Sequence, residues 1–101
     1  MDKKVIPMVN FFNSIGLKTH MSCSGHFNLD GRMSLFWIEF DSSVTEEMLV
    51  ELWNKNYTPN GWFVQRLIPG PKYNMHRWCY VTGNWWSAKQ DLKNWKKLYE
   101  I

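Results

Sequence analysis

The segment from Lys18 to His26 brings together the side chains of this chain best suited to chemistry or to anion binding. Ser22, Ser24 and Gly25 surround a thiol and are followed by an imidazole. Gly25 allows a turn that other residues resist, and consecutive peptide N–H groups in such a turn can hold an anion. The segment therefore predicts a phosphate-binding loop, with the Gly25 backbone closest to the anion. A turn that needs Gly and Ser for geometry alone is the alternative interpretation.

Histidines and cysteines spaced by two residues raise the questions of a metal site and of thiol catalysis. On a regular strand, residues three apart point to opposite faces, so His76 and Cys79 cannot both reach one ion. The same holds for His20 and Cys23 if the strand continues to Cys23, which leaves Cys23 and His26 as the one easy pair of ligands. We therefore expect no metal site. Cys23 beside His26 could form a nucleophile and base. Alternation places Cys23 in the core, where a thiol is commonly inert, and the preferred interpretation is that the protein is not an enzyme.

Arginines and surplus aromatic residues favour a nucleotide as the ligand. Guanidinium groups bind phosphate through paired hydrogen bonds, and an aromatic ring stacks on a base. The arginines suited to the first role are Arg32, Arg66 and Arg77, and the aromatic residues suited to the second are Phe27, Trp37 and Trp78. The predicted ligand-binding residues are His20, Ser22, Ser24, Gly25, His26, Phe27, Arg32, Trp37, Arg77 and Trp78.

The composition predicts one globular domain that spans residues 1–101. The chain is 45% apolar, and 17% of its residues are aromatic, including seven tryptophans. A core of this size cannot bury them all, so we expect some at a ligand site or at a subunit interface of a homo-oligomer. The net charge of +3 fits a small anionic partner but is too weak to indicate duplex nucleic acid.

Two cysteines do not make a disulfide framework, and both are expected to be reduced. The apolar stretch after Met1 is short and is broken by Pro7, which does not match a secretory signal. No apolar run is long enough for a membrane span. We therefore expect no cofactor, no membrane partner and a cytoplasmic location.

Periodicity and turn residues predict seven elements. The apolar spacing indicates a helix first, and a capping box, Ser43 to Glu46, opens a second helix that runs to Lys55. Pro69-Gly70-Pro71 forces a turn between two strands. The expected elements are a helix at 5–15, a strand at 17–23, a loop at 24–31, a strand at 32–40, a helix at 43–55, strands at 62–68 and 73–82, and a helix at 85–99.

The order αββαββα predicts an α+β fold of two layers, with an antiparallel four-stranded sheet and the helices on one face. Phe36, Ile38 and Phe40 alternate along one strand and should point to the helices. The opposite face is expected to be aromatic and to bind a ligand or another protein. The residues assigned to that face are His20, Ser22, Leu35, Trp37, Glu39, His76, Trp78 and Tyr80.

The pattern Thr19-x-x-Ser22-Cys23-Ser24-Gly25-His26, followed by the apolar strand that ends at Phe40, resembles small uncharacterised proteins of tailed phages that carry a Ser-Cys-(Ser/Cys)-Gly-His segment. The likeness covers about the first 40 residues. A Ser-Cys-Ser-Gly segment also resembles the wybutosine-synthesis methyltransferase family, where Arg follows the Gly; this chain has His26 there and is far shorter.

The phage resemblance implies an anti-defence sponge, located in the host cytoplasm, that sequesters a phosphorylated nucleotide signal such as a cyclic nucleotide without altering it. Two alternatives remain open on the sequence. One is an enzyme that modifies a nucleotide or a tRNA base with Cys23 and His26. The other is an inhibitor that binds a host protein through the aromatic face.

Overall fold

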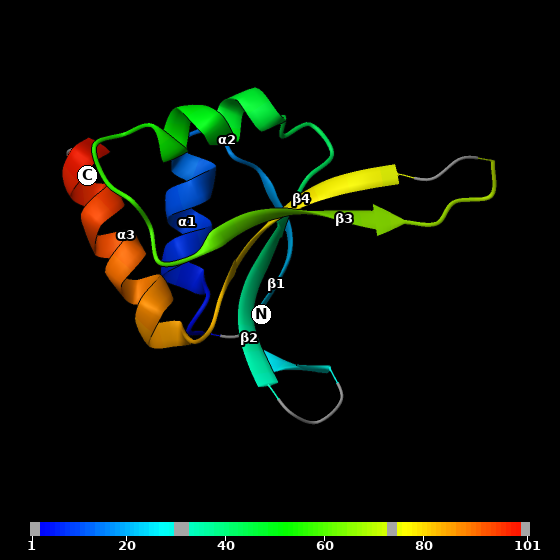
Figure 1. Cartoon of the computed structure of the whole chain (residues 1–101), viewed down its shortest axis with the longest axis horizontal. Coiled ribbons are helices and arrows are strands. Elements are labelled where there is room, and N and C mark those ends of the chain that lie inside the picture. Colours follow the sequence, from blue (N-terminus) through cyan, green and yellow to red (C-terminus); the bar gives the residue numbers. More distant parts are fainter. Residues whose placement is uncertain (1–2, 30–32, 73–74, 100–101) are drawn as a thin grey trace.

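The computed structural model describes residues 3–29, 33–72 and 75–99, and their side chains except those of 23–29, 33–34 and 68. The elements are α1 (Ile6–Ser14), β1 (Thr19–Leu29), β2 (Met33–Phe40), α2 (Glu46–Trp53), β3 (Trp62–Ile68), β4 (Met75–Thr82) and α3 (Trp85–Tyr99) (Figure 1). The four strands form one antiparallel sheet in the order β1-β2-β4-β3. This confirms the predicted α+β class and the order αββαββα.

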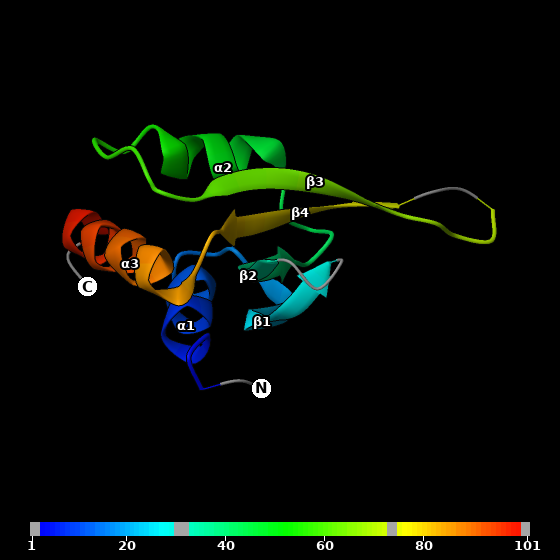
Figure 2. The same cartoon turned by 60° about the horizontal axis from the view of Figure 1, so that its bottom comes forward.

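One face of the sheet and all three helices share a single core. Phe36, Ile38 and Phe40 of β2 point into it and are almost completely buried, as predicted. Phe12 of α1 lies at its centre, with its ring 5.0 Å from that of Phe40 and 5.8 Å from that of Trp95 in α3. Figure 2 shows α1 and α3 side by side, with α2 above β3. The helices therefore cover one face, and we call the opposite face of the sheet the open face.

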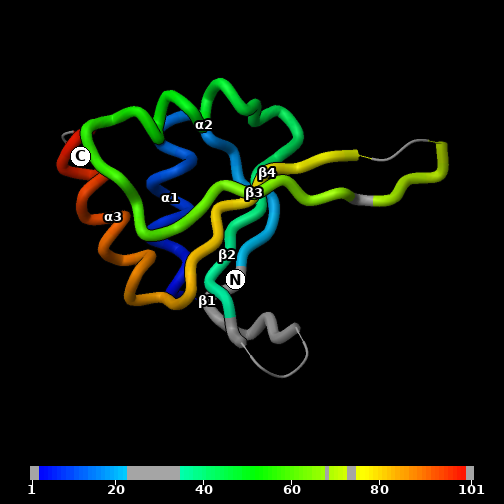
Figure 3. The backbone as a smooth tube through the Cα atoms, viewed as in Figure 1, coloured from blue at the N-terminus to red at the C-terminus, as the bar shows by residue number. Residues whose placement is uncertain are grey.

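The hairpin of β3 and β4 reaches beyond the helices. Its register runs from Trp62 opposite Val81 to Ile68 opposite Met75. In Figure 3 this hairpin extends to the right, past the end of α2. Pro69 and Gly70 follow the end of β3, in agreement with the predicted turn. Because its outer half has no helix over it, apolar side chains there, such as Leu67, are exposed.

The predicted loop at 24–31 is wrong over 24–29, because β1 continues as a strand to Leu29, and residues 30–31 lie outside the described residues. Register shifts interrupt the pairing of β1 with β2 between Thr19 and Met21 and again between Ser24 and Phe27. An extra residue in one strand inverts the alternation of every residue after it. Met21, which by alternation shares the predicted core face of Cys23, is consequently 49% exposed. The register also pairs Cys23 with Trp37, which lies on the open face, and not with a core residue as predicted.

The predicted face of β4 is also wrong. Tyr80 was assigned to the open face, but it lies opposite the core residue Ile38 and is fully buried. Its hydroxyl donates a hydrogen bond to Asp91 of α3, which makes burial of this polar ring acceptable. Trp78, two residues earlier, packs against the same core. The residues of β4 on the open face are therefore the alternate set that includes Cys79 and Val81.

Helix α2 begins at Glu46, three residues after the predicted start at 43. Its N-cap is Thr45, whose hydroxyl accepts a hydrogen bond from the Met48 N–H at 3.4 Å. Ser43 lies instead in a turn, where its N–H donates to the Asp41 carboxylate at 3.0 Å. Asp41 thus satisfies the backbone of this turn, and the predicted capping box from Ser43 to Glu46 is replaced by one that starts at Thr45.

A fully buried carboxylate, Asp91, holds the segment before β3 against α3. It accepts hydrogen bonds from the Tyr57 hydroxyl at 2.5 Å and from the N–H groups of Asn60 at 2.7 Å and Gly61 at 3.0 Å, as well as from Tyr80. A buried carboxylate is stable only when its oxygens are satisfied in this way. Burial, and after it the proximity of this carboxylate, raises the pKa of both tyrosines above the usual value. Asp91 therefore has a structural role.

Candidate functional site

A pocket of about 330 Å³ lies on the open face of the sheet. Its volume falls within the usual range for small-molecule sites, about 300–1,000 Å³. Strands β2, β3 and β4 supply all of its described lining, and no helix contributes. The lining residues are Leu35, Trp37, Val64, Gln65, Arg66, Cys79 and Val81. We call it the open-face pocket.

Two arginines share one buried carboxylate beside this pocket. Arg66 and Arg77 lie directly opposite each other on β3 and β4, an arrangement that like charges alone would make unfavourable. Glu39, which is 1% exposed, accepts from Arg66 Nη1 at 2.7 Å and from Arg77 Nη1 at 3.3 Å. Two guanidinium groups against one carboxylate leave one net positive charge at the edge of the pocket.

Arg66 has hydrogen-bonding capacity to spare. Its side chain is 54% exposed and it uses one nitrogen, Nη1, for Glu39. A guanidinium carries five N–H donors, and its remaining donors have no partner among the residues that the structure describes. Arg77 is more enclosed, and its buried Nε–H has no hydrogen-bond partner within the described part of the chain. An anion over Arg66 would therefore gain bonds without breaking the contact with Glu39.

The thiol in the pocket is not set up as a nucleophile. Cys79 is buried, and burial followed by the Glu39 carboxylate raises the pKa of this thiol to about 11, while Arg66 acts in the opposite direction. A thiol with that pKa is protonated near neutral pH, whereas catalysis needs the thiolate. Cys79 therefore forms part of an apolar floor and has no acid–base role at neutral pH.

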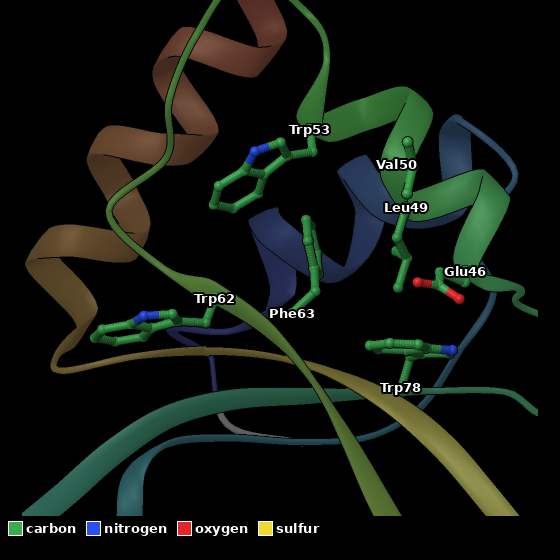
Figure 4. Close-up of a pocket in the computed structure, with 7 residues that line it drawn as sticks. All are labelled: Glu46, Leu49, Val50, Trp53, Trp62, Phe63 and Trp78. Atoms are coloured by element: carbon green, nitrogen blue, oxygen red, sulfur yellow. The ribbon is translucent and has the colours of Figure 1, made fainter.

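A second hollow of about 280 Å³ lies between α2 and the strands β3 and β4 (Figure 4). Its walls are aromatic, and its one charged lining residue among those described is acidic. The lining residues are Glu46, Leu49, Val50, Trp53, Trp62, Phe63 and Trp78. We call it the α2 cleft. Because Glu46 would repel a phosphate, the two hollows differ in the sign of the charge that they accept.

The structure separates the predicted ligand-binding residues. Trp37 lines the open-face pocket. Arg77 is not among the lining residues, but it shares the Glu39 carboxylate with Arg66, which is. Trp78 lines the α2 cleft, on the opposite face of the sheet. Ser22 lies opposite the core residue Ile38, so its assignment to the open face is wrong.

The remaining predicted residues lie on β1 or between β1 and β2. His20 is exposed and lines neither hollow. The backbone of Ser24, Gly25, His26 and Phe27 belongs to β1, next to the strand that carries Trp37, but their side chains are outside the described ones. Arg32 lies outside the described residues altogether.

Sequence reasoning missed the roles of Glu39 and Cys79 and left Arg66 as one of three phosphate candidates. One feature that could have found Glu39 is a carboxylate between the apolar residues of β2, because such a group needs a cationic partner on a neighbouring strand. No three His, Cys, Asp or Glu side chains of the described residues lie close enough to hold a metal ion.

Comparison with protein-family models, with curated proteins and with solved structures gives no match for this chain. Among the described helices, none has the length and apolar character needed to cross a membrane.

Proposed function

We propose that this protein binds a small phosphorylated nucleotide in the open-face pocket and holds it without chemical change. The observation that carries the proposal is that Trp37, an aromatic ring, and Arg66, an exposed guanidinium with spare donors, line the same pocket of suitable volume. An aromatic surface and a phosphate-binding cation at one site are what a nucleotide requires.

The phosphate is assigned to Arg66. Glu39 fixes one end of the guanidinium, so little side-chain freedom is lost when an anion binds the other. The net positive charge of the Glu39, Arg66 and Arg77 group attracts an anion and would not favour a cation. Hydrogen bonds to charged groups contribute about 1.5–3 kcal/mol each.

The base is assigned to Trp37 and to the apolar side chains beside it, Leu35 and Val81. Trp37 is half-buried, and the strand alternation holds its side chain on the open face. Stacking on such a ring contributes roughly 1–3 kcal/mol per base and tolerates different bases. The pocket is thus suited to a class of nucleotides, including cyclic ones.

Retention of the ligand without chemical change is supported by the protonated thiol of Cys79, the nucleophilic side chain among the described lining residues. A protein that binds a nucleotide signal and leaves it intact acts by lowering its free concentration. That is the sponge role which the resemblance to small phage proteins implies, and we extend the proposal to it.

Isothermal titration tests the proposal with AMP, 3′,5′-cyclic AMP and ADP-ribose as ligands and adenosine as the phosphate-free control. We expect at least one phosphorylated ligand to bind more tightly than adenosine. Arg66→Gln should weaken that binding by roughly 10- to 100-fold, the equivalent of a lost charged hydrogen bond. The fold should survive, because Arg77 still pairs with Glu39.

Lys72→Gln is the matched control, since it removes the same charge from an exposed position outside the pocket. It should change the affinity less than twofold. The proposal fails if no nucleotide binds, or if both variants lose affinity equally. Mass spectrometry of the ligand recovered after denaturation should show it unaltered; a converted ligand would instead support the enzymatic alternative.

A further inference from the structure

The α2 cleft has the composition of a site for an organic cation. Trp53, Trp62, Phe63 and Trp78 line it together with two aliphatic residues of α2. Three of its apolar side chains, including Trp53 at 41% and Trp62 at 57%, are exposed, so the aromatic surface is accessible from solution. The face of an aromatic ring carries partial negative charge and attracts a cation, with tryptophan the strongest of the three ring types.

The one charge in the described lining of the cleft has the sign that a cation requires. Glu46 lies in the first turn of α2 and is exposed, and none of the ion pairs of the described residues uses it. In the view of Figure 4, its carboxylate is on the same side of the cleft as Trp78. A carboxylate next to indole rings, on a chain whose net charge is positive, is a local reversal of charge.

Among the described residues, the indole rings of Trp85 and Trp86 at the start of α3 already have a cation over them, whereas those of the cleft do not. Lys89 Nζ lies 4.8 Å from the centroid of the Trp85 ring and 5.6 Å from that of Trp86. Within the described part of the chain, no lysine or arginine lies over Trp53, Trp62 or Trp78. The cleft therefore offers cation-binding rings that the protein itself does not occupy.

From these observations we infer that the α2 cleft binds a quaternary ammonium ion, with the indole rings around its methyl groups and the Glu46 carboxylate balancing its charge. A quaternary ammonium suits the cleft better than a primary one, because its methyl groups contact apolar walls and it has no N–H donors to leave unsatisfied. This site is separate from the open-face pocket and does not depend on the function proposed for that pocket.

The test compares choline with 3,3-dimethyl-1-butanol, its neutral analogue of the same shape. Titrations of ¹⁵N-labelled protein are followed through the indole N–H resonances, which are assigned by single Trp→Phe variants. Choline should shift the resonances of Trp53, Trp62 and Trp78 and leave those of Trp85 and Trp86 in place. The neutral analogue should bind about fivefold more weakly or not at all.

Glu46→Gln and Glu47→Gln form a matched pair, because both change an exposed carboxylate in the first turn of α2 and only Glu46 lines the cleft. We expect choline affinity to fall roughly two- to fivefold for Glu46→Gln and to be unchanged for Glu47→Gln. The inference is overturned if choline does not bind, if the neutral analogue binds equally well, or if the two variants behave alike.

Discussion

Replacing Asp91 by Asn should cause a large loss of stability with almost no change in shape. In the native protein, one carboxylate oxygen accepts from the Tyr57 hydroxyl and the Asn60 N–H, and the other accepts from the Gly61 N–H and the Tyr80 hydroxyl. An amide keeps one acceptor and turns the other into a donor. In either orientation, one hydroxyl and one backbone N–H then meet an NH₂ group.

The size of the stability loss depends on which donors can find a new hydrogen bond in the Asp91→Asn variant. The hydroxyl can rotate and accept from the new NH₂, but the backbone N–H cannot, and it stays buried without a partner at a cost of about 1–3 kcal/mol. The bonds that remain also lose the assistance of the negative charge. We expect a total loss of roughly 2–4 kcal/mol, a substantial part of the roughly 5–15 kcal/mol typical of a domain.

Urea unfolding followed by tryptophan fluorescence measures this loss as a lower midpoint with an unchanged slope. Asp41→Asn is the control, because Asp41 also accepts backbone and side-chain hydrogen bonds, from Ser43, but at the surface. Its midpoint should move far less. If the midpoints of the two variants shift equally, burial is not what makes Asp91 indispensable.

Two further predictions concern the stability of the fold. Gly61→Ala should destabilise the fold by about 1–3 kcal/mol in urea unfolding, because a Cβ there would lie 2.7 Å from a backbone oxygen of β4 and closer still to the Tyr80 ring. Gly83→Ala is the control, since a Cβ at Gly83 meets open space, and it should cost much less. Equal losses of stability in the two variants would contradict this prediction. The free energy of unfolding should also fall as the pH rises above about 9. The pKa values of Cys79, Tyr57 and Tyr80 are raised in the folded state, so these groups lose their protons at a lower pH in the unfolded chain, and this favours unfolding. A free energy of unfolding that does not change from pH 8 to 11 would contradict the burial of these groups.

The order of elements could be predicted from the sequence because it depends on local features. The apolar spacing before Gly16 indicates a helix, and the run that ends at Phe40, apolar on both faces for most of its length, indicates a central strand. The faces of two strands could not be predicted so easily. The register shift between Thr19 and Met21 inverts the alternation of β1, and nothing in the local sequence marks it. In β4, both alternating sets mix polar and apolar residues, and the buried partner of Tyr80, Asp91, lies eleven positions later in another element.

The wrongly assigned faces of β1 and β4 explain why only part of the candidate site could be predicted. Trp37 was assigned to the correct face of the sheet because β2 is regular and its core face is strongly apolar. Trp78 was assigned to the same site but lies in the α2 cleft, since its face depends on the alternation of β4. The ion pair of Glu39 with Arg66 joins residues 27 positions apart on β2 and β3, and it could be predicted only if the order of the strands in the sheet were known.

The most direct test of nucleotide binding on the open face is a titration of ¹⁵N-labelled protein with the tightest-binding nucleotide, followed through the indole N–H resonances. Trp37 lines the open-face pocket and Trp78 lines the α2 cleft, so the two resonances report on different faces of the sheet. We expect the Trp37 resonance to shift with saturation and that of Trp78 to stay in place. A shift of Trp78 with Trp37 unmoved, or no shift of either at saturating nucleotide, would contradict the account.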